Sequence, residues 1–575
     1  MPAASLADDV REPIDAAIDD LGHGSRAWAA LTVAQRVTLL RGVRRTVAAT
    51  ARLWARTAAA SKQLDDAHPL RGEEWLSGPY AALGALDAYI ETLERIATGR
   101  NPLDGVRIDR APGGRTRVHS FPLTGIDRVL LSGFTGEVWL QPGVTPGDAR
   151  SRAGLAQRTP APDDGGVGLV LGAGNITSIP VLDVLYELLA HDRVALLKVN
   201  PTQDALVPVY EKALAPLIAP GFLRIVRGGA DVGTYLTGHS GFAHVHITGS
   251  APTFDAIVWG TGAQAKRRRR EDRPLLKKPI TAELGGVSPI IVVPGVWTDD
   301  DLRYHAEHIA TMRLQNCGHN CIAGQVVLMS ADWAQKDQFL AELRRAYATA
   351  PERPIWYPRS DERMAQAAEA YPDALVLADR LLVEIGDGDD PTAMEHTEYF
   401  APVLGVEQLP GEGQEFLDAA VAHANDRLQG TLGANVLIAP ETEALLGAGF
   451  ERAIADLRYG AIAINTWTAF AFITPTTTWG AFPGSTIEDV GSGIGVVHNA
   501  LLLADVERSV VRGPFRPFPR SLSIVRDGGR FTILPKPPWF VSARTAAEVS
   551  EGLTRFRARG GVLALLRTLV QAMKA

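Results

Sequence analysis

Residues 316–324, with the sequence NCGHNCIAG, hold both cysteines of the chain, Cys317 and Cys321. Upstream, residues 282–286 read AELGG and include Glu283. A cysteine thiolate can attack a carbonyl carbon, and a carboxylate can activate the water that later releases the product. Taken alone, each segment favours a structural interpretation, because free cysteines often fill cores and glutamate before two glycines often ends a strand. The chemical hypothesis therefore depends on the two segments occurring together.

The composition excludes several classes of protein. The chain has 575 residues, of which 46% are apolar and 21% charged, as in ordinary globular proteins of two or three lobes. A net charge of −7 predicts no attraction to nucleic acid or to an anionic membrane. Two cysteines four residues apart form neither a disulfide framework nor a zinc site, so we expect no metal and a reducing compartment. The sequence shows no signal-peptide pattern and no apolar run long enough to span a membrane, so we expect a cytoplasmic enzyme.

Helices and a less regular region precede the central motifs. Residues 1–24 are acidic and rich in alanine, which predicts either a loosely held arm or an early helix. Apolar residues recur at helical spacing in residues 25–64 and again in 80–97. Short apolar runs at residues 129–131 and 137–140 predict strands, followed by a linker rich in glycine, proline and aspartate. We interpret residues 126–160 as strands that could join another subunit, together with this linker.

A β-loop-α-β unit follows. Residues 167–171 and 194–198 are short apolar runs typical of buried parallel strands, and residues 180–190 between them predict a helix. Gly172 and Gly174 form a loop of the kind that faces a nucleotide. The dinucleotide fingerprint is incomplete, because Thr177 stands at the place of its third glycine.

The two segments around Cys321 and Glu283 resemble the aldehyde dehydrogenase superfamily. In that family ELGG carries a general base, and N-x-G-Q-x-C-x-A-G carries the nucleophile. This chain matches the second motif except that His319 replaces the glutamine, and the alignment selects Cys321 over Cys317. The resemblance therefore implies Cys321 as nucleophile and Glu283 as general base.

The resemblance extends into the cofactor-binding half and implies NAD or NADP as the cofactor. It places Asn175 as an oxyanion donor, although an asparagine there could instead cap a helix. Lys198 falls where a lysine contacts the adenosine ribose, or it is a solvated residue at the end of a strand. The acidic residue that often follows this lysine is replaced by Pro201, which leaves the choice between NAD and NADP open. The implied cofactor contacts are Gly172, Gly174, Lys198, Gly229, Gly249, Ser250, Leu284, Glu398 and Phe400.

The resemblance implies an α/β fold like that of the aldehyde dehydrogenases. We expect an atypical Rossmann cofactor domain over residues 25–280 and a related α/β catalytic domain over 281–475. Residues 476–575 would return to the cofactor domain, complete a small oligomerisation element and end in helices. A homo-oligomer, either a dimer or a tetramer, is implied in the same way.

Two stretches bear on ligands. Residues 468–478 are rich in alanine, phenylalanine and threonine and predict an apolar entrance for the substrate. The basic run at residues 266–273 predicts a solvated loop or, alternatively, an anion site for a phosphate or coenzyme A. No aromatic residues interrupt this run, so it does not favour nucleic-acid stacking.

The resemblance implies NAD(P)-dependent oxidation of an apolar aldehyde to a carboxylic acid through a thiohemiacetal and a thioester on Cys321. The alternative is an acyl-CoA reductase, because Val184 replaces a lysine found in hydrolytic members and residues 175–178 resemble the coenzyme-A-acylating branch. Retention of Glu283 favours water as the acyl acceptor. A non-catalytic protein on the same fold is the third possibility.

Overall fold

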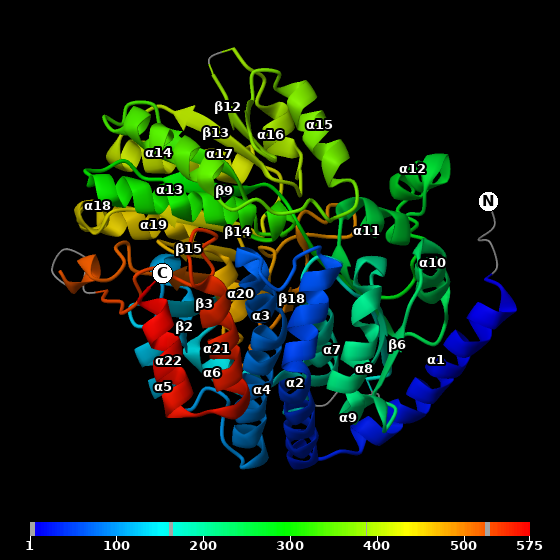
Figure 1. Ribbon diagram of the computed structural model, residues 1–575. Coiled ribbons are helices and arrows are strands. Elements are labelled where there is room, and N and C mark those ends of the chain that lie inside the picture. The colour runs from blue at the N-terminus through cyan, green and yellow to red at the C-terminus, as the bar shows by residue number, and fades with distance from the viewer. Residues whose placement is uncertain (1–5, 160–164, 387, 524–529, 575) are drawn as a thin grey trace.

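The computed structural model describes residues 6–159, 165–386, 388–523 and 530–574. Two β-sheets lie side by side, with helices on their faces and two long N-terminal helices running between them (Figure 1). The α/β class expected from the sequence is confirmed. No helix in these described ranges is long and apolar enough to cross a membrane.

The smaller sheet has six strands in the order β17-β8-β7-β4-β5-β6. All neighbouring pairs are parallel except β17 with β8. The predicted strands at residues 167–171 and 194–198 are confirmed as β4 and β5. The bounds are β4 Val167–Leu171, β5 Val194–Lys198, β6 Leu223–Val226, β7 His244–Gly249, β8 Ile280–Leu284 and β17 Gly493–Ile494.

Helices cover both faces of this sheet. All residues of α7 (Ile179–Ala190) are buried, because the helix packs against β4, β5 and α4. Its two buried acidic residues, Asp183 and Glu187, lie beside His246 and His244 of β7. The remaining helices of this half are α8 Val207–Ala213, α9 Ala215–Ile218, α10 Ala230–Gly238, α11 Ala251–Val258 and α12 Gly262–Arg270.

The larger sheet has eleven strands in the order β1-β2-β3-β19-β15-β14-β9-β10-β13-β12-β11. Strands β19 to β12 in this order are parallel, and antiparallel strands extend both ends. The bounds are β1 Ile108–Arg110, β2 Thr116–Phe121, β3 Thr135–Leu140, β9 Ser288–Val292, β10 Gly324–Ser330, β11 Leu375–Leu377, β12 Arg380–Glu384, β13 Val403–Leu409, β14 Gly433–Leu437, β15 Ala461–Ile464 and β19 Val506–Arg512. A separate pair joins β16 Trp479–Gly480 to β18 Val496–Val497.

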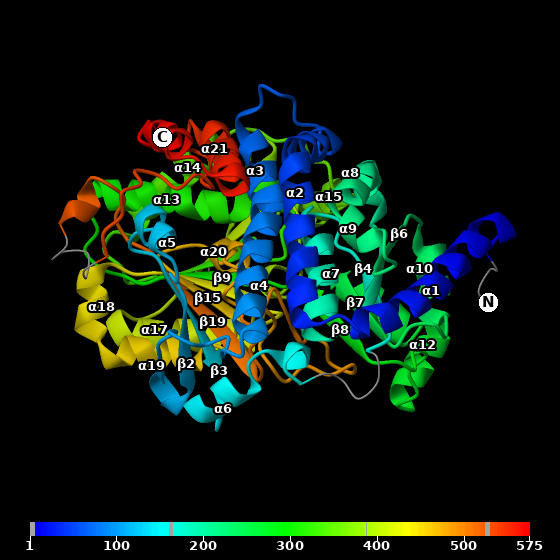
Figure 2. The ribbon, with the colours of Figure 1, turned by 90° about the horizontal axis from the view of Figure 1, so that it is seen from below.

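Two helix layers enclose the larger sheet (Figure 2). On one face lie α13 (Asp299–Leu314) and α14 (Lys336–Thr349), and on the other lie α17 to α19. Thr298 and Asp301 form a capping box that starts α13, and the acidic residues 299–301 lie in its first turn, at the positive end of the helix dipole. The other bounds are α15 Ser360–Ala370, α16 Thr392–His396, α17 Gly413–Asp426, α18 Pro440–Leu446, α19 Ala448–Asp456 and α20 Ala469–Ile473.

The N-terminal segment is a packed helix over its described length. Helix α1 (Asp8–Ala29) buries Ile14, Ile18 and Leu21 and packs on strands β5 and β6. Of the two predicted alternatives the early helix is therefore correct, and the boundary at residue 24 falls inside it; residues 1–5 lie outside the described ranges. The following helices are α2 Val33–Ser61, α3 Gly72–Trp75 and α4 Ala81–Ala97.

Three expectations for the middle of the chain are wrong. Residues 129–131 end helix α5 (Gly125–Leu130), which Thr124 caps, and do not form a strand. Strand β3 pairs on both sides within this chain, with β2 and β19, and therefore offers no free edge to another subunit. Helix α6 (Pro146–Arg152) occupies part of the predicted linker, of which residues 160–164 lie outside the described ranges.

The predicted domain limits also need correction. Residue 281 lies inside β8, so the crossing from the smaller to the larger sheet comes after Leu284. Strands β1 to β3 had been assigned to the cofactor domain but belong to the larger sheet.

The tail and the basic run have defined structures. Helices α21 (Ala546–Arg559) and α22 (Val562–Ala572) flank a break at Gly560 and Gly561, as predicted, and α21 packs on α3. Most of the basic run at 266–273 is an exposed helical turn of α12 and its end, so the predicted loop is wrong in conformation.

Candidate active site

Cys321 lies where the chain leaves α13 and enters β10. Asn316 and Cys317 both have left-handed backbone conformations, with φ of 54° and 58°, and Gly318 follows with φ of 73°. Such conformations are uncommon for residues with a side chain and indicate a backbone held by its surroundings. This tight turn ends the helix and presents Cys321 to two cavities, whose walls it shares.

The first cavity is large, with a volume of about 1090 Å³, and opens along the smaller sheet. Eight of the nine predicted cofactor contacts line it: Gly172, Gly174, Lys198, Gly229, Gly249, Ser250, Glu398 and Phe400. The ninth, Leu284, lies in the core, 1% exposed, and Gly285 occupies the wall beside it. The side chain of Leu284 therefore does not line the cavity, and its contact with the cofactor stays a prediction.

The chemistry of this cavity fits a dinucleotide. A Cβ at Gly174 would lie only 2.7 Å from Thr202 Oγ1 and 2.8 Å from Asn200 Cγ, so a bare backbone is required at this loop. Burial raises the pKa of the Glu398 carboxyl to about 7, and its Oε1 has no hydrogen-bond partner in the described structure. That oxygen is an available acceptor for a ribose hydroxyl.

The second cavity is apolar and small, about 60 Å³. Helix α20, within the predicted entrance at 468–478, supplies Ala469, Phe470, Phe472 and Ile473. Trp539, from the C-terminal segment, also lines it and was not anticipated from the sequence. Cys321 therefore stands between a nucleotide-sized cavity and an apolar one.

Glu283 is buried against the cysteine. Its Oε1 accepts a hydrogen bond of 3.0 Å from Trp479 Nε1, and the Cys321 thiol hydrogen-bonds to the same carboxylate. Burial raises the pKa of Glu283 to about 7, while these hydrogen bonds act to lower it. Burial, followed by the charge of Glu283, holds the pKa of Cys321 well above its usual value. The cysteine is therefore a thiol at neutral pH, with a base beside it.

Asn175 lies against the nucleophile loop. Its Nδ2 donates to the carbonyl of His319 at 2.9 Å, and the N-cap of α7 is Ser178. The helix-cap alternative for Asn175 is therefore wrong. Asn175 lines the large cavity, and one hydrogen of its amide remains for a second acceptor.

Comparison with known proteins agrees with this arrangement. A family model described as the aldehyde dehydrogenase family matches residues 198–354. A putative aldehyde dehydrogenase from Burkholderia cenocepacia is similar over 89% of this chain and 94% of its own, at 20% identity and a TM-score of 0.56. An aldehyde dehydrogenase from Mycobacterium tuberculosis complexed with NAD⁺ is similar over 87% and 89%, at 18% identity and a TM-score of 0.56. An NADP-dependent glyceraldehyde-3-phosphate dehydrogenase from Bacillus halodurans, complexed with NADP, is similar over 87% and 91%, at 16% identity and a TM-score of 0.56.

The segment that matches the family model, residues 198–354, contains both Glu283 and Cys321. The solved structures share the fold with this chain, and their low identity carries no further specificity to it.

One departure from the family motif, His319, is explained by its surroundings. Burial holds the pKa of His319 well below its usual value, so the ring is neutral. Its Nε2 lies 2.9 Å from Ser360 Oγ, and the ring packs beside Trp356, Tyr357 and Phe400. His319 therefore stabilises the nucleophile loop by packing and does not act as a general acid or base.

A buried ionic network, which the sequence reasoning missed, supports the same loop. Lys62 Nζ lies 2.9 Å from Glu74 Oε1 and donates to Asn316 Oδ1 at 3.1 Å. Arg353 pairs with Glu73 and Glu74 and donates to Asn316 Oδ1 at 3.2 Å. The backbone N–H of Asn316 donates to Glu73 Oε2 at 3.1 Å. The adjacent acidic pair at 73–74 in an otherwise apolar helical pattern was the one available signal.

Three further residues of the large cavity were also missed. Tyr357 and Arg363 line it beside Phe400, and Arg268 reaches it from the basic run. Arg268 Nη1 donates to the carbonyl of Trp259 at 3.1 Å, which fixes the guanidinium at the cavity wall. Of the basic run at 266–273, Arg268 therefore lies where it could bind an anion in the large cavity.

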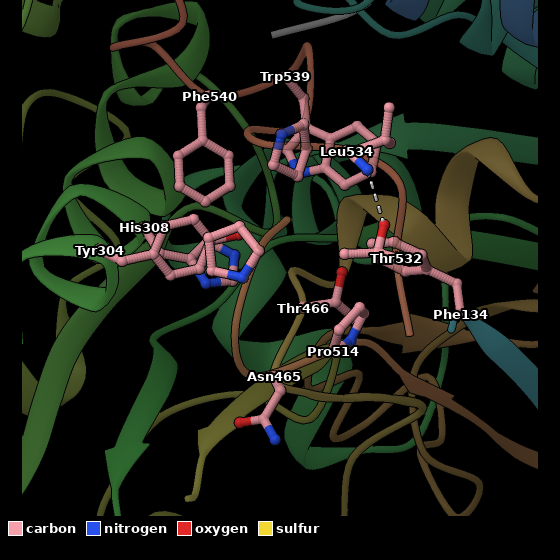
Figure 3. A pocket seen from close by; sticks show the side chains of 12 residues that line it. Phe134, Tyr304, His308, Asn465, Thr466, Pro514, Thr532, Leu534, Trp539 and Phe540 are labelled. Atoms are coloured by element: carbon pink, nitrogen blue, oxygen red, sulfur yellow. Dashed lines mark hydrogen bonds between the residues drawn. The ribbon is translucent and has the colours of Figure 1, made fainter. Parts of the chain in front are cut away.

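A third hollow is too small for a substrate. It lies where residues 514–517 and 532–540 meet α13, and Tyr304, His308, Trp539 and Phe540 form its aromatic wall (Figure 3). Its volume of about 10 Å³ has room for roughly one water molecule. This hollow is not a ligand site.

Proposed function

We propose that the protein is an NAD(P)-dependent aldehyde dehydrogenase that oxidises an apolar aldehyde to a carboxylic acid. The observation that carries this proposal is the position of Cys321 in the walls of both cavities, with Glu283 hydrogen-bonded to its thiol. An aldehyde in the apolar cavity and a nicotinamide in the large one would meet at the sulfur.

The large cavity would hold the dinucleotide. The glycine loop at 172–174 admits the pyrophosphate closely, Lys198 and Glu398 would bind the two ribose groups, and Phe400 would pack beside the nicotinamide ring. A bound nicotinamide dinucleotide supplies a hydride acceptor.

The chain's own residues supply the remaining chemistry. Glu283 takes the thiol proton, and Cys321 Sγ then attacks the aldehyde carbon to form a thiohemiacetal. The free amide hydrogen of Asn175 and the backbone N–H of Cys321 stabilise the oxyanion. Loss of a hydride from that carbon leaves a thioester. Glu283 passes the thiol proton to solvent, which restores its carboxylate, and then deprotonates a water that attacks the thioester. The carbon–sulfur bond breaks, the proton returns from Glu283 to the sulfur, and the carboxylic acid is released.

The second candidate is an acyl-CoA reductase, in which coenzyme A exchanges with the acyl-thioester. The observation in its favour is Arg268, a cation in the cavity wall that would bind an additional phosphate. The same guanidinium would serve the 2′-phosphate of NADP, so Arg268 also bears on the choice of nucleotide.

Cofactor binding and turnover test this proposal together. Tryptophan fluorescence should be quenched on adding NAD or NADP, and an aldehyde screen with and without coenzyme A should identify the acyl acceptor. We expect aldehyde-dependent reduction of the nucleotide without coenzyme A. Activity that requires coenzyme A would favour the reductase, and nucleotide binding without activity would favour a non-catalytic protein.

The two cysteines provide a matched pair of variants. Cys321→Ala should abolish turnover and leave nucleotide binding intact. Cys317→Ala should keep most of the activity, because burial raises the pKa of Cys317 to about 12 and its Sγ faces the carbonyl of Arg353. The reverse result would show that the nucleophile is misassigned.

The oligomeric state and the cellular compartment of the protein are also proposed. We propose a cytoplasmic homo-oligomer, a dimer or a tetramer, on the family resemblance alone. Size-exclusion chromatography with light scattering measures the assembly directly.

A further inference from the structure

Three potential metal ligands meet on the catalytic half, outside the two cavities at Cys321. Glu395 comes from α16, Glu407 from β13 and His423 from α17. One ligand atom from each lies within 4.8 Å of the other two. Glu395 is 0% exposed and Glu407 5% exposed, while the edge of His423 reaches solvent.

The contacts between the His423 ring and the two glutamates are not ordinary hydrogen bonds. His423 Nε2 lies 2.9 Å from Glu407 Oε2 and 3.2 Å from Glu395 Oε1. Neither approach has hydrogen-bond geometry, and Nε2 has no hydrogen-bond partner in the described structure. An imidazole nitrogen carries one hydrogen and cannot satisfy two carboxylates at once.

Of the two buried carboxylates, Glu407 has fewer partners to balance its charge. Its Oε1 is buried and has no partner in the described part of the chain, and its ionic neighbour is the imidazole of His423. Glu395 has a second partner, because Arg427 Nη2 lies 3.0 Å from its Oε2. Arg427 is more than half exposed, so it compensates two buried carboxylates only in part. A buried carboxylate without a partner is costly, and a cation between the three ligands would remove that cost.

We propose that Glu395, Glu407 and His423 bind a divalent transition-metal ion of the zinc class. Zinc binds imidazole nitrogen and carboxylate oxygen at about 2.0–2.2 Å in a tetrahedron, which places its ligands roughly 3.3 Å apart. The separations of 2.9 and 3.2 Å around His423 Nε2 agree with that spacing. Magnesium and calcium prefer all-oxygen shells with more ligands, so an imidazole among three ligands disfavours them.

The site has a structural role. The ion would link helix α16, strand β13 and helix α17, of which Arg427 joins only the end of α17 to α16 through Glu395. The exposed edge of His423 leaves the fourth position to water. This inference does not depend on the proposed oxidation, since it concerns none of the groups at Cys321.

The test uses the Cys321→Ala chain, so that the reactive thiol cannot capture zinc. The protein is treated with EDTA, exchanged into chelator-free buffer, titrated with ZnCl₂ by calorimetry and heated with and without zinc. We expect one zinc ion per chain and a higher midpoint of thermal unfolding in its presence. No stoichiometric binding and an unchanged midpoint would overturn the site and leave a protonated His423 ion pair as the explanation.

Variants locate the ion. Glu407→Gln keeps the shape of the side chain and should weaken zinc binding at least tenfold, and His423→Ala should abolish it. His396→Ala is the matched control, because His396 is an exposed histidine at the end of the same helix α16. His396→Ala should bind zinc as tightly as its parent. Equal binding in parent, Glu407→Gln and His423→Ala would place the ion elsewhere and overturn the inference.

Discussion

Trp479 Nε1 donates a hydrogen bond of 3.0 Å to Glu283 Oε1. Glu283 is in β8 of the smaller sheet, and Trp479 is in β16, 196 residues later along the chain, where it returns toward that sheet. Gly493 in β17 then pairs with Glu283 through the backbone. The proposed base is therefore held on two sides by the returning segment, and its protonation depends on that segment.

The first prediction concerns the pH dependence of Trp479→Phe. The indole N–H stabilises the ionised carboxylate and thereby lowers the pKa of Glu283, which burial has raised to about 7. Its removal should raise that pKa by about one to two units, given about 1.5–3 kcal/mol for a hydrogen bond to a charged group. Because the base must be ionised, the acidic limb of the kcat/KM profile should move to higher pH.

Trp259→Phe provides the control for this profile. Its indole Nε1 donates to the carbonyl of Ile487 at 3.2 Å, so it also loses a buried indole hydrogen bond, but one that does not reach Glu283. The acidic limb should stay in place in this variant. An equal shift in both variants would show that Trp479 acts through general stability and not through Glu283.

The second prediction is a burst in Glu283→Gln. The charge of Glu283 raises the pKa of Cys321, so its removal should lower that pKa and let the thiolate form without the base. Thiol attack and loss of the hydride should therefore survive, while hydrolysis of the thioester slows. Rapid mixing should show about one equivalent of reduced nucleotide per active chain, followed by slow turnover. Loss of burst and turnover together would instead restrict Glu283 to activating the thiol.

Local patterns in the sequence predicted the centre of the fold well. The apolar runs at β4 and β5 are bounded by turn residues and too short for helices, so their strand assignment was secure. The order of Glu283 and Cys321 likewise implied a shared site, and the structure places them in contact. Each of these runs and motifs spans only a few neighbouring residues, so it can be recognised from the sequence.

Contacts between distant segments could not be predicted in this way. The run at 129–131 resembles a strand, but Thr124 caps a short helix there and Val129 is left 60% exposed. Trp539 reaches the apolar cavity because residues 532–540 pack against α13, and nothing in its local sequence indicates this. Lys62 and Glu73 likewise reach Asn316 from a segment that precedes the cofactor sheet.

The third prediction concerns the size of the substrate. Trp539 lines the apolar cavity and packs against Phe470, with ring centroids 6.3 Å apart. Trp539→Ala should enlarge the cavity and raise kcat/KM for longer or branched aldehydes relative to short ones. Trp539→Phe keeps most of the volume and should preserve the original preference. A parallel change for all aldehydes in Trp539→Ala would show that this cavity does not select the substrate.

The last prediction concerns the stability of the nucleophile loop. Lys62 and Glu74 are both buried, and Lys62 also donates to Asn316 Oδ1. Lys62→Met should keep the packing of the stem but leave Glu74 with Arg353 as its remaining ionic partner. Breaking a buried pair in this way costs about 3–5 kcal/mol, and urea unfolding should show a loss of that order.

The matched control for this loss is Arg344→Met. Arg344 pairs with Glu384 at the surface, where an ion pair contributes only about 0–1 kcal/mol. If Lys62→Met costs no more than Arg344→Met, the buried network does not support the loop. If the loss is large, Lys62→Met should also slow alkylation of Cys321 by iodoacetamide in the folded protein. The reason is that Asn316, whose left-handed turn presents the cysteine, would lose one of the two cations at its Oδ1.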